Sequence, residues 1–168
     1  MLTFLALLAA QATTPPPPPV PIDCSDAAHR AFDFFVGDWE VTDRQSGKIV
    51  ATSRIERILG GCAIKESYDQ NIGPDGTATD YRGTSYTAFN VRAGWRQFYV
   101  DSSGAAAAYT GGIVDGAMVL TATNGVATNR MTIAPQPDGS VRQTGMVSLD
   151  GGRTWASPGY DFTYRRKA

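Results

Sequence analysis

The sequence predicts an all-β protein, an antiparallel up-and-down barrel of about nine or ten strands with one short N-terminal helix. Two observations lead to this fold class. Turn signals such as Ser46-Gly47, Asp115-Gly116 and Asn124-Gly125 recur about every ten to twenty residues, the spacing of an antiparallel meander. The segments between them alternate apolar and polar residues, and no helical segment joins one to the next. Closure into a barrel is expected because it leaves no exposed sheet edge.

The expected strands are the alternating segments between turns, at residues 39–43, 48–59, 62–69, 82–91, 95–101, 117–123, 130–135, 140–149 and 160–166. The expected helix is SDAAHRAFDFF, residues 25–35. Ser25 or Asp26 is suited to cap its N-terminus, and Gly37 is suited to end it. Its apolar stripe consists of Ala28, Phe32 and Phe35.

The N-terminal region divides into two expected segments before the barrel domain. Residues 1–12, MLTFLALLAAQA, are predicted to be a signal peptide that ends in the small-x-small pattern Ala10-Gln11-Ala12. Residues 13–23 are a Pro-rich linker expected to be extended, and residues 24–168 form the barrel domain. We therefore expect a periplasmic or secreted protein whose mature chain has no transmembrane segment.

Two cysteines, Cys24 and Cys62, fall within the expected domain. An even count in an exported chain favours one disulfide between them. The loop that it closes predicts a stabilisation of about 4 kcal/mol. Two cysteines without further Cys or His residues nearby do not favour a zinc site.

Several motifs together resemble a known family. Residues 32–41, FDFFVGDWEV, resemble the first strand of a lipocalin-like barrel. The ordered set of Cys24 with FDFFVGDW, GCAIKE, WRQFYVD, DGAMVL, PDGSVRQ and SLDGGRTW resembles a family of secreted bacterial proteins of unknown function with a calycin-type domain. The resemblance covers nearly all of residues 24–168 and implies the fold and export, but no reaction.

Residues 148–155, SLDGGRTW, spell the Asp-box of sialidases and related propellers. A propeller would need one copy per blade and a far longer chain, so the single copy predicts a hairpin element instead. Asp150 is expected to accept hydrogen bonds from the turn backbone, and Trp155 is expected to return as a buried anchor in the next strand.

Alternate residues of a barrel strand face the lumen, and this places a candidate ligand site. On residues 95–101 the aromatic and polar positions share one face, which we expect to point inward. The predicted ligand-binding residues are Glu66, Tyr68, Ser85, Trp95, Gln97, Tyr99, Asp101 and Gln143. Such a lining predicts a small, partly apolar or amphipathic ligand.

Two alternatives stay open at this point. The lumen could be filled by side chains, and the protein could act as an interaction module of the cell envelope through the long NIGPDGTATD loop, residues 71–80, with an unidentified protein partner. An enzyme is the third hypothesis, in which Glu66 and Asp101 divide the roles of acid and base. No residue is assigned as catalytic.

Other classes are not favoured. His29 is the one histidine and is expected on the helix surface, which excludes a multi-His metal centre and argues against haem. The net charge of −1 and the dispersed basic residues argue against nucleic-acid binding. The chain has no Gly-x-Ser-x-Gly elbow, phosphate-binding glycine loop or EF-hand pattern, so no cofactor or metal is expected.

Overall fold

The computed structural model describes residues 22–156 and 159–167. The expected signal peptide and most of the linker lie outside these residues. The strands are β1 (Gly37–Asp43), β2 (Ile49–Ile58), β3 (Ala63–Ile72), β4 (Ala78–Asn90), β5 (Gly94–Asp101), β6 (Ala106–Val114), β7 (Ala117–Asn124), β8 (Ala127–Pro135), β9 (Val141–Ser148) and β10 (Tyr160–Arg166).

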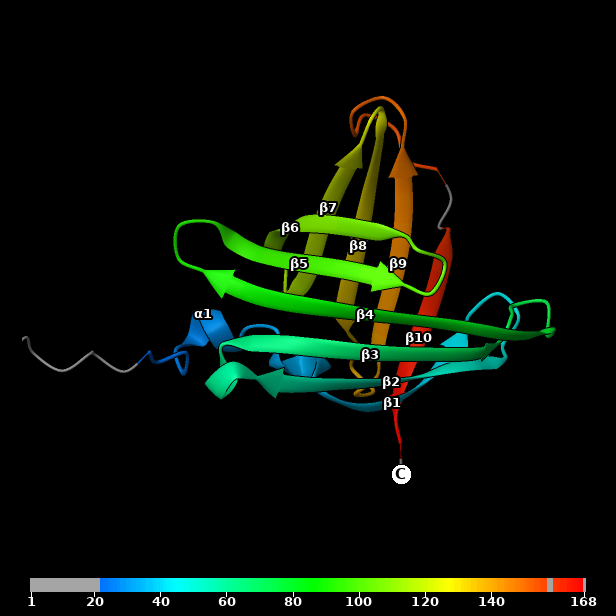
Figure 1. The fold of residues 1–168 in the computed structure, drawn as a ribbon, viewed down its shortest axis with the longest axis horizontal. Helices are drawn as coiled ribbons and strands as arrows, with labels where there is room; N and C mark the ends of the chain where they lie inside the picture. Colours follow the sequence, from blue (N-terminus) through cyan, green and yellow to red (C-terminus); the bar gives the residue numbers. More distant parts are fainter. Residues whose placement is uncertain (1–21, 157–158, 168) are drawn as a thin grey trace, which may run out of the picture.

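These strands form one closed antiparallel barrel, as predicted. Each strand pairs with the next along the chain, and β1 pairs with β10 from Trp39 opposite Arg166 to Asp43 opposite Phe162. In Figure 1 the long strands β2 to β5 run across the view, and β7 to β9 run up behind them. The barrel is therefore flattened into two crossing layers, with its core between them.

Two predictions about the strands were wrong. Strand β6 was not expected, because Ala106, Ala107 and the pair Gly111-Gly112 have low intrinsic preference for strands. Its pairing with β5 and β7 determines its conformation instead. The expected long loop at residues 71–80 is mostly strand, since β3 and β4 extend to Ile72 and Ala78 and leave a short turn.

The predicted helix over residues 25–35 is also corrected, because the segment forms two shorter elements. Helix α1 (Ala27–Arg30) is capped by the Asp26 side chain, and the 3₁₀ helix η1 (Asp33–Phe35) follows it. Both Phe32 and Phe35 are buried, whereas Ala28 is exposed. Turning both phenylalanines inward interrupts the regular helix at Phe32. No helix among the described residues is long and apolar enough to cross a membrane.

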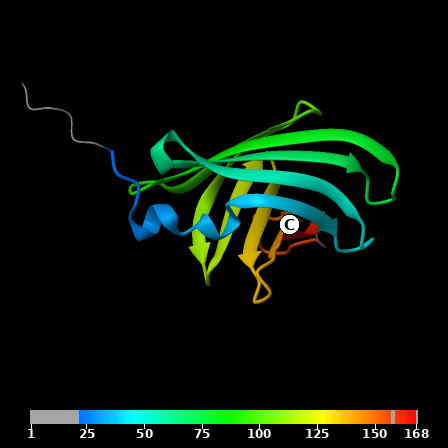
Figure 2. The same cartoon turned by 90° about the horizontal axis from the view of Figure 1, so that it is seen from below.

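This N-terminal segment closes one end of the barrel (Figure 2). Phe32 and Phe35 pack against each other, with Phe32 edge-on to Trp95 and Phe35 beside Trp39. The indole N–H of Trp39 donates a 2.9 Å hydrogen bond to the carbonyl oxygen of Phe35. We call Phe32, Phe35, Trp39 and Trp95 the aromatic plug.

A glycine is needed beside the plug. Gly37 has φ = 150°, a backbone conformation that residues with a side chain rarely adopt, and the flexible guanidinium of Arg166 occupies the space beside its Cα. That guanidinium lies 4.5 Å from the centre of the Trp39 ring. The Gly-x-Trp pattern of the sequence therefore lets the chain approach closely while the indole turns into the core.

Polar contacts and a disulfide hold the plug segment to the wall. Arg57 of β2 forms an ion pair with Asp33 and donates a hydrogen bond to the carbonyl of His29. The predicted disulfide is confirmed, because Cys24 and Cys62 are bonded with their Cα atoms 5.1 Å apart. It joins Cys24, three residues before α1, to Cys62, the residue that follows the second 3₁₀ helix, η2 (Leu59–Gly61).

The disulfide closes a loop with a sequence separation of 38. We expect the double variant Cys24→Ser, Cys62→Ser to lower the free energy of unfolding by about 4 kcal/mol, because the unfolded chain gains entropy. Urea denaturation followed by tryptophan fluorescence measures the loss. Reducing agent should lower the stability of the wild type and leave the double variant unchanged. Equal stability of both proteins without reductant would contradict this assignment.

The SLDGGRTW motif forms the expected polar turn. Asp150 Oδ1 accepts hydrogen bonds from the backbone N–H groups of Arg153 and Thr154, and Ser148 Oγ accepts one from Gly152. The pKa of Asp150 is lowered to about 2, mainly because the hydroxyl and the backbone N–H of Thr154 donate hydrogen bonds to its carboxylate. The prediction for Trp155 was wrong, because it lies before β10, is only partly buried and stacks under Arg130 at 4.0 Å.

Candidate functional site

The inward-facing residues of the long strands become more polar with distance from the aromatic plug. Along β3 they change from Ile64 to Glu66, Tyr68 and Gln70, and along β5 from Trp95 to Gln97 and Tyr99. Since inward positions alternate, one strand supplies both core and site residues. The apolar set fills the plugged end of the barrel, and the polar set surrounds the space beyond it.

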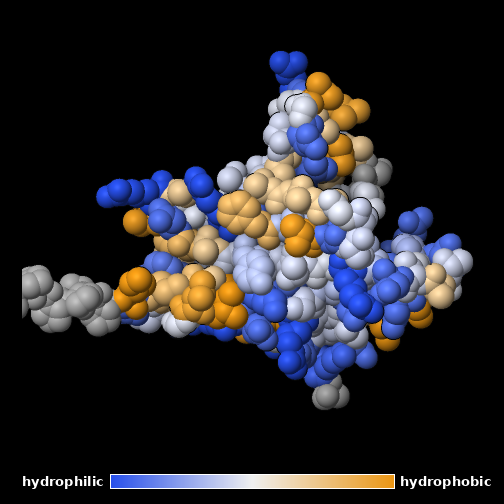
Figure 3. Space-filling view, in the orientation of Figure 1, coloured by the Kyte–Doolittle hydropathy of each residue, from blue (hydrophilic) through white to orange (hydrophobic). Residues whose placement is uncertain are grey.

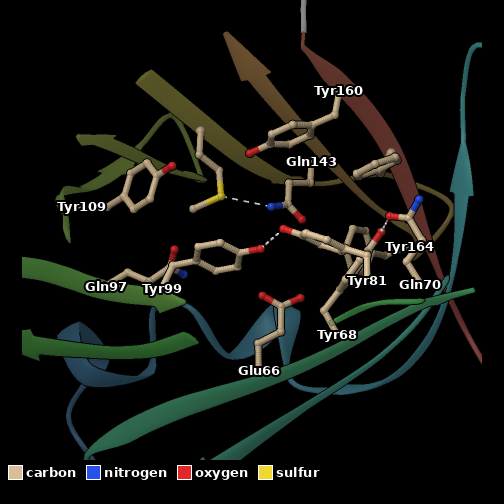
Figure 4. Close-up of a pocket in the computed structure, with 12 residues that line it drawn as sticks. Glu66, Tyr68, Gln70, Tyr81, Gln97, Tyr99, Tyr109, Gln143, Tyr160 and Tyr164 are labelled. Carbon is tan, nitrogen blue, oxygen red and sulfur yellow. Dashed lines mark hydrogen bonds between the residues drawn. The ribbon is translucent and has the colours of Figure 1, made fainter. Parts of the chain in front are cut away.

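That space is a cavity of about 300 Å³. Figure 4 shows the side chains that converge on it from β3, β4, β5, β6 and β8 to β10. The lining residues are Glu66, Tyr68, Gln70, Tyr81, Gln97, Tyr99, Tyr109, Met131, Gln143, Tyr160, Phe162 and Tyr164. Six of the seven tyrosines of the chain are in this set. The lumen is therefore hollow at this end, and its wall is both aromatic and polar.

Five of the eight predicted ligand-binding residues line the cavity: Glu66, Tyr68, Gln97, Tyr99 and Gln143. The other three lie outside its lining. Ser85 is buried behind Glu66 and hydrogen bonds to its carboxylate. Trp95 belongs to the aromatic plug, and Asp101 lies at the end of β5.

Sequence reasoning missed seven lining residues: Gln70, Tyr81, Tyr109, Met131, Tyr160, Phe162 and Tyr164. The alternation of Tyr160, Phe162 and Tyr164 in the last predicted strand was a usable signal for an inward aromatic face. Tyr109 lies on β6, the strand that was not predicted. Tyr81 lies one residue before the expected start of its strand, where β4 extends further than the pattern indicated.

Two glycines make room for cavity tyrosines. A Cβ atom at Gly83 would come within 2.7 Å of the hydroxyl oxygen of Tyr99, and one at Gly145 would overlap the ring of Tyr160. Gly145 is directly opposite Tyr160 in the β9–β10 pair. Each ring therefore lies close over the neighbouring strand, which leaves the central volume open.

A chain of hydroxyl groups leads from the cavity to Asp101. The hydroxyls of Tyr99 and Tyr81 are hydrogen bonded to each other, and Tyr81 donates to Asp101 Oδ2 at 3.0 Å. The other oxygen, Asp101 Oδ1, accepts from Ser103, and this contact is the main reason that the pKa of Asp101 is lowered. Asp101 thus ends β5, accepts hydrogen bonds from the turn that follows, and is linked to the cavity lining through Tyr81.

Glu66 is the one carboxyl group among the lining side chains, which include no Lys, Arg or His. Its carboxylate accepts a 2.8 Å hydrogen bond from Ser53 and a second hydrogen bond from Ser85. No described Lys, Arg or His forms an ion pair with it. Burial raises the pKa of Glu66, and the two serine hydroxyls offset part of that rise.

Gln143 presents a second acceptor to the cavity. Its side chain is 9% exposed, and its Nε2 atom donates to the sulfur of Met131 at 3.0 Å. Its Oε1 atom is buried without a hydrogen-bond partner in the described part of the chain. Figure 4 shows the amide directed into the space between Tyr160 and Tyr99. An unpartnered buried acceptor marks a place where a ligand donor would be stabilised.

The structure does not bring metal-ligating side chains together. Within residues 22–156 and 159–167, no three His, Cys, Asp or Glu residues are grouped as metal ligands. His29, predicted on the helix surface, is instead half-buried: its ring packs edge-on against Phe89, and its Nδ1 atom lies 2.6 Å from Asp26. It lies at the plugged end and does not line the cavity.

Comparison with known proteins adds no family to this description, because the sequence matches no family model and no curated protein. The resemblance to a secreted calycin-type family therefore stays a prediction.

We expect Glu66→Gln to stabilise the protein at neutral pH and to have little effect near pH 4. Because its pKa is raised on folding, Glu66 binds more protons in the folded than in the unfolded state, so stability falls as pH rises above about 4.5, the ordinary glutamate pKa. The glutamine variant does not titrate at this position, so its stability does not fall with pH for this reason. A gain of 1 kcal/mol would raise Tm by about 3 °C, measured by calorimetry at both pH values.

The matched control is Glu40→Gln, the same change on the exposed outer face of β1. It should leave the pH dependence of Tm unchanged. A Glu66→Gln variant that is equally destabilised at both pH values would contradict the assigned desolvation of this carboxylate.

Proposed function

We propose that this protein is an exported carrier or sensor that binds a small, partly apolar ligand in the open half of its barrel. One observation carries the proposal: a cavity of about 300 Å³ remains beside a tightly packed aromatic plug. That volume is at the lower end of the range for small-molecule sites. The combination of aromatic rings with a few directed polar groups is also typical of such sites.

Export is part of the same proposal. The apolar N-terminal segment and the Pro-rich linker support it, and so does the disulfide, since such bonds persist in oxidising compartments. A carrier in the periplasm or outside the cell would need a stable fold around a solvent-filled lumen. The disulfide supplies stability at the plugged end, away from the cavity.

Ligand binding is tested by native mass spectrometry of the mature protein purified from its own source, compared with the same sample after denaturation. A mass excess that disappears on denaturation is the expected result. The variant Met131→Trp should lose this excess, because an indole in place of the flexible methionine would occupy the cavity. Val126→Trp, in an exposed turn, is the matched control and should keep it.

Wild type that shows no mass excess, and no rise in Tm across a panel of small metabolites, would contradict ligand binding. Equal loss of ligand in both tryptophan variants would show that Met131→Trp acts through general damage. Circular dichroism of each variant checks that the barrel has formed.

An interaction module is a second candidate, and the outer wall supplies the observation that favours it. Tyr86 and Phe98 are direct cross-strand neighbours on β4 and β5, and Val100 follows on the same outer face. Phe98 is 60% exposed. Figure 3 shows apolar surface over this part of the barrel. Sedimentation that depends on concentration, and becomes monomeric in Phe98→Ser, would support a protein contact here.

A further inference from the structure

Some polar side chains of the cavity have hydrogen-bond partners within the wall and others do not. The atoms without partners indicate which chemical groups a ligand would need. Gln70 accepts from Tyr68 and donates to the carbonyl of Ile72, so both ends of its amide are used. Gln97 donates to Thr87 at 3.0 Å. Both ends of the Gln70 amide and the amide nitrogen of Gln97 therefore have partners within the wall.

Two acceptors in the wall, Gln143 Oε1 and the Glu66 carboxyl, could accept further hydrogen bonds. Gln143 Oε1 is buried without a partner among the described residues. Glu66 is a carboxylate with room for about four hydrogen bonds, and its partners are the neutral hydroxyls of Ser53 and Ser85. An added group that satisfies both must donate hydrogen bonds, and a cationic donor would also stabilise the ionised form of Glu66, which burial disfavours.

The aromatic rings of the wall also favour a cationic group. Six tyrosine rings and Phe162 surround the cavity, and burial raises the pKa of Tyr68, Tyr99 and Tyr160, which keeps these phenols neutral. Neutral aromatic rings attract cations through their negative faces, most strongly where water is excluded. An anionic ligand would instead enter a site that holds the Glu66 carboxyl and whose lining has no cationic side chain.

We propose that the ligand is a small organic amine whose protonated nitrogen pairs with Glu66, donates toward Gln143 and packs its apolar body against the tyrosine rings. This inference rests on the proposed function, namely that the cavity binds a ligand. Glu66 and Gln143 then determine specificity, and the rings supply most of the contact area. A buried carboxylate that is costly in the empty protein becomes complementary in the complex.

Three probes of similar size separate the ligand classes: phenethylammonium, 2-phenylethanol and 3-phenylpropanoate. Each is titrated into the wild-type protein at pH 8 by calorimetry. We expect the ammonium probe to bind at least about tenfold more tightly than the alcohol, because a charge-assisted hydrogen bond replaces a neutral one. The carboxylate probe should bind most weakly.

Variants then assign the difference to Glu66. Glu66→Gln keeps the shape of the side chain and should reduce binding of the ammonium probe to about the level of the alcohol, a loss of roughly tenfold, while alcohol binding changes little. Gln143→Met should weaken the ammonium probe by a smaller factor, about threefold, since it removes a neutral acceptor. Glu40→Gln, on the outer face, should change neither.

The outcomes separate this inference from the proposed function. If the alcohol or the carboxylate binds as tightly as the ammonium probe, or if Glu66→Gln leaves ammonium binding unchanged, the amine assignment is overturned while ligand binding stands. If the wild type binds none of the three at millimolar concentration, the amine assignment is overturned and the proposed function loses its support from this cavity.

Discussion

Closure of one barrel end by the aromatic plug is the constraint on which the rest of the structure depends. Trp39 is fully buried and hydrogen bonds to the carbonyl of Phe35, which ties the first strand to the segment that precedes it. The disulfide and Arg57 hold that segment against β2 and β3. Because this end is packed with apolar side chains, it stabilises the barrel, and the other end need not be filled.

The open half of the lumen carries the opposite chemistry. Burial of a carboxylate and of an unpartnered amide oxygen lowers stability, and a protein selected only for stability would place apolar side chains there. Gly83 and Gly145 have no side chain to pack, and this allows Tyr99 and Tyr160 to lie close to the wall. Departures from good packing at one place are the pattern expected of a functional site.

The two conspicuous motifs of the sequence have different relations to that site. SLDGGRTW is a self-contained turn in which Asp150 and Ser148 satisfy the backbone, and its residues do not line the cavity. WRQFYVD serves both halves of the barrel, with Trp95 in the plug and Gln97 and Tyr99 in the cavity wall. A motif that is easy to recognise therefore supports the fold, whereas a less distinctive strand supplies site residues.

The sequence by itself determined the fold class, the disulfide and the inward face of several strands, because turn glycines, cysteine count and two-residue alternation act locally along the chain. For the same reason it placed Glu66, Tyr68, Gln97, Tyr99 and Gln143 on the inward face, where they line the cavity. Tertiary structure alone decided that β6 is a strand, that the N-terminal helix breaks at Phe32, and that Asp101 lies outside the cavity lining, hydrogen bonded to Tyr81. It also decided which part of the lumen is packed with side chains and which part is a cavity, because this depends on how side chains from distant strands meet across the lumen.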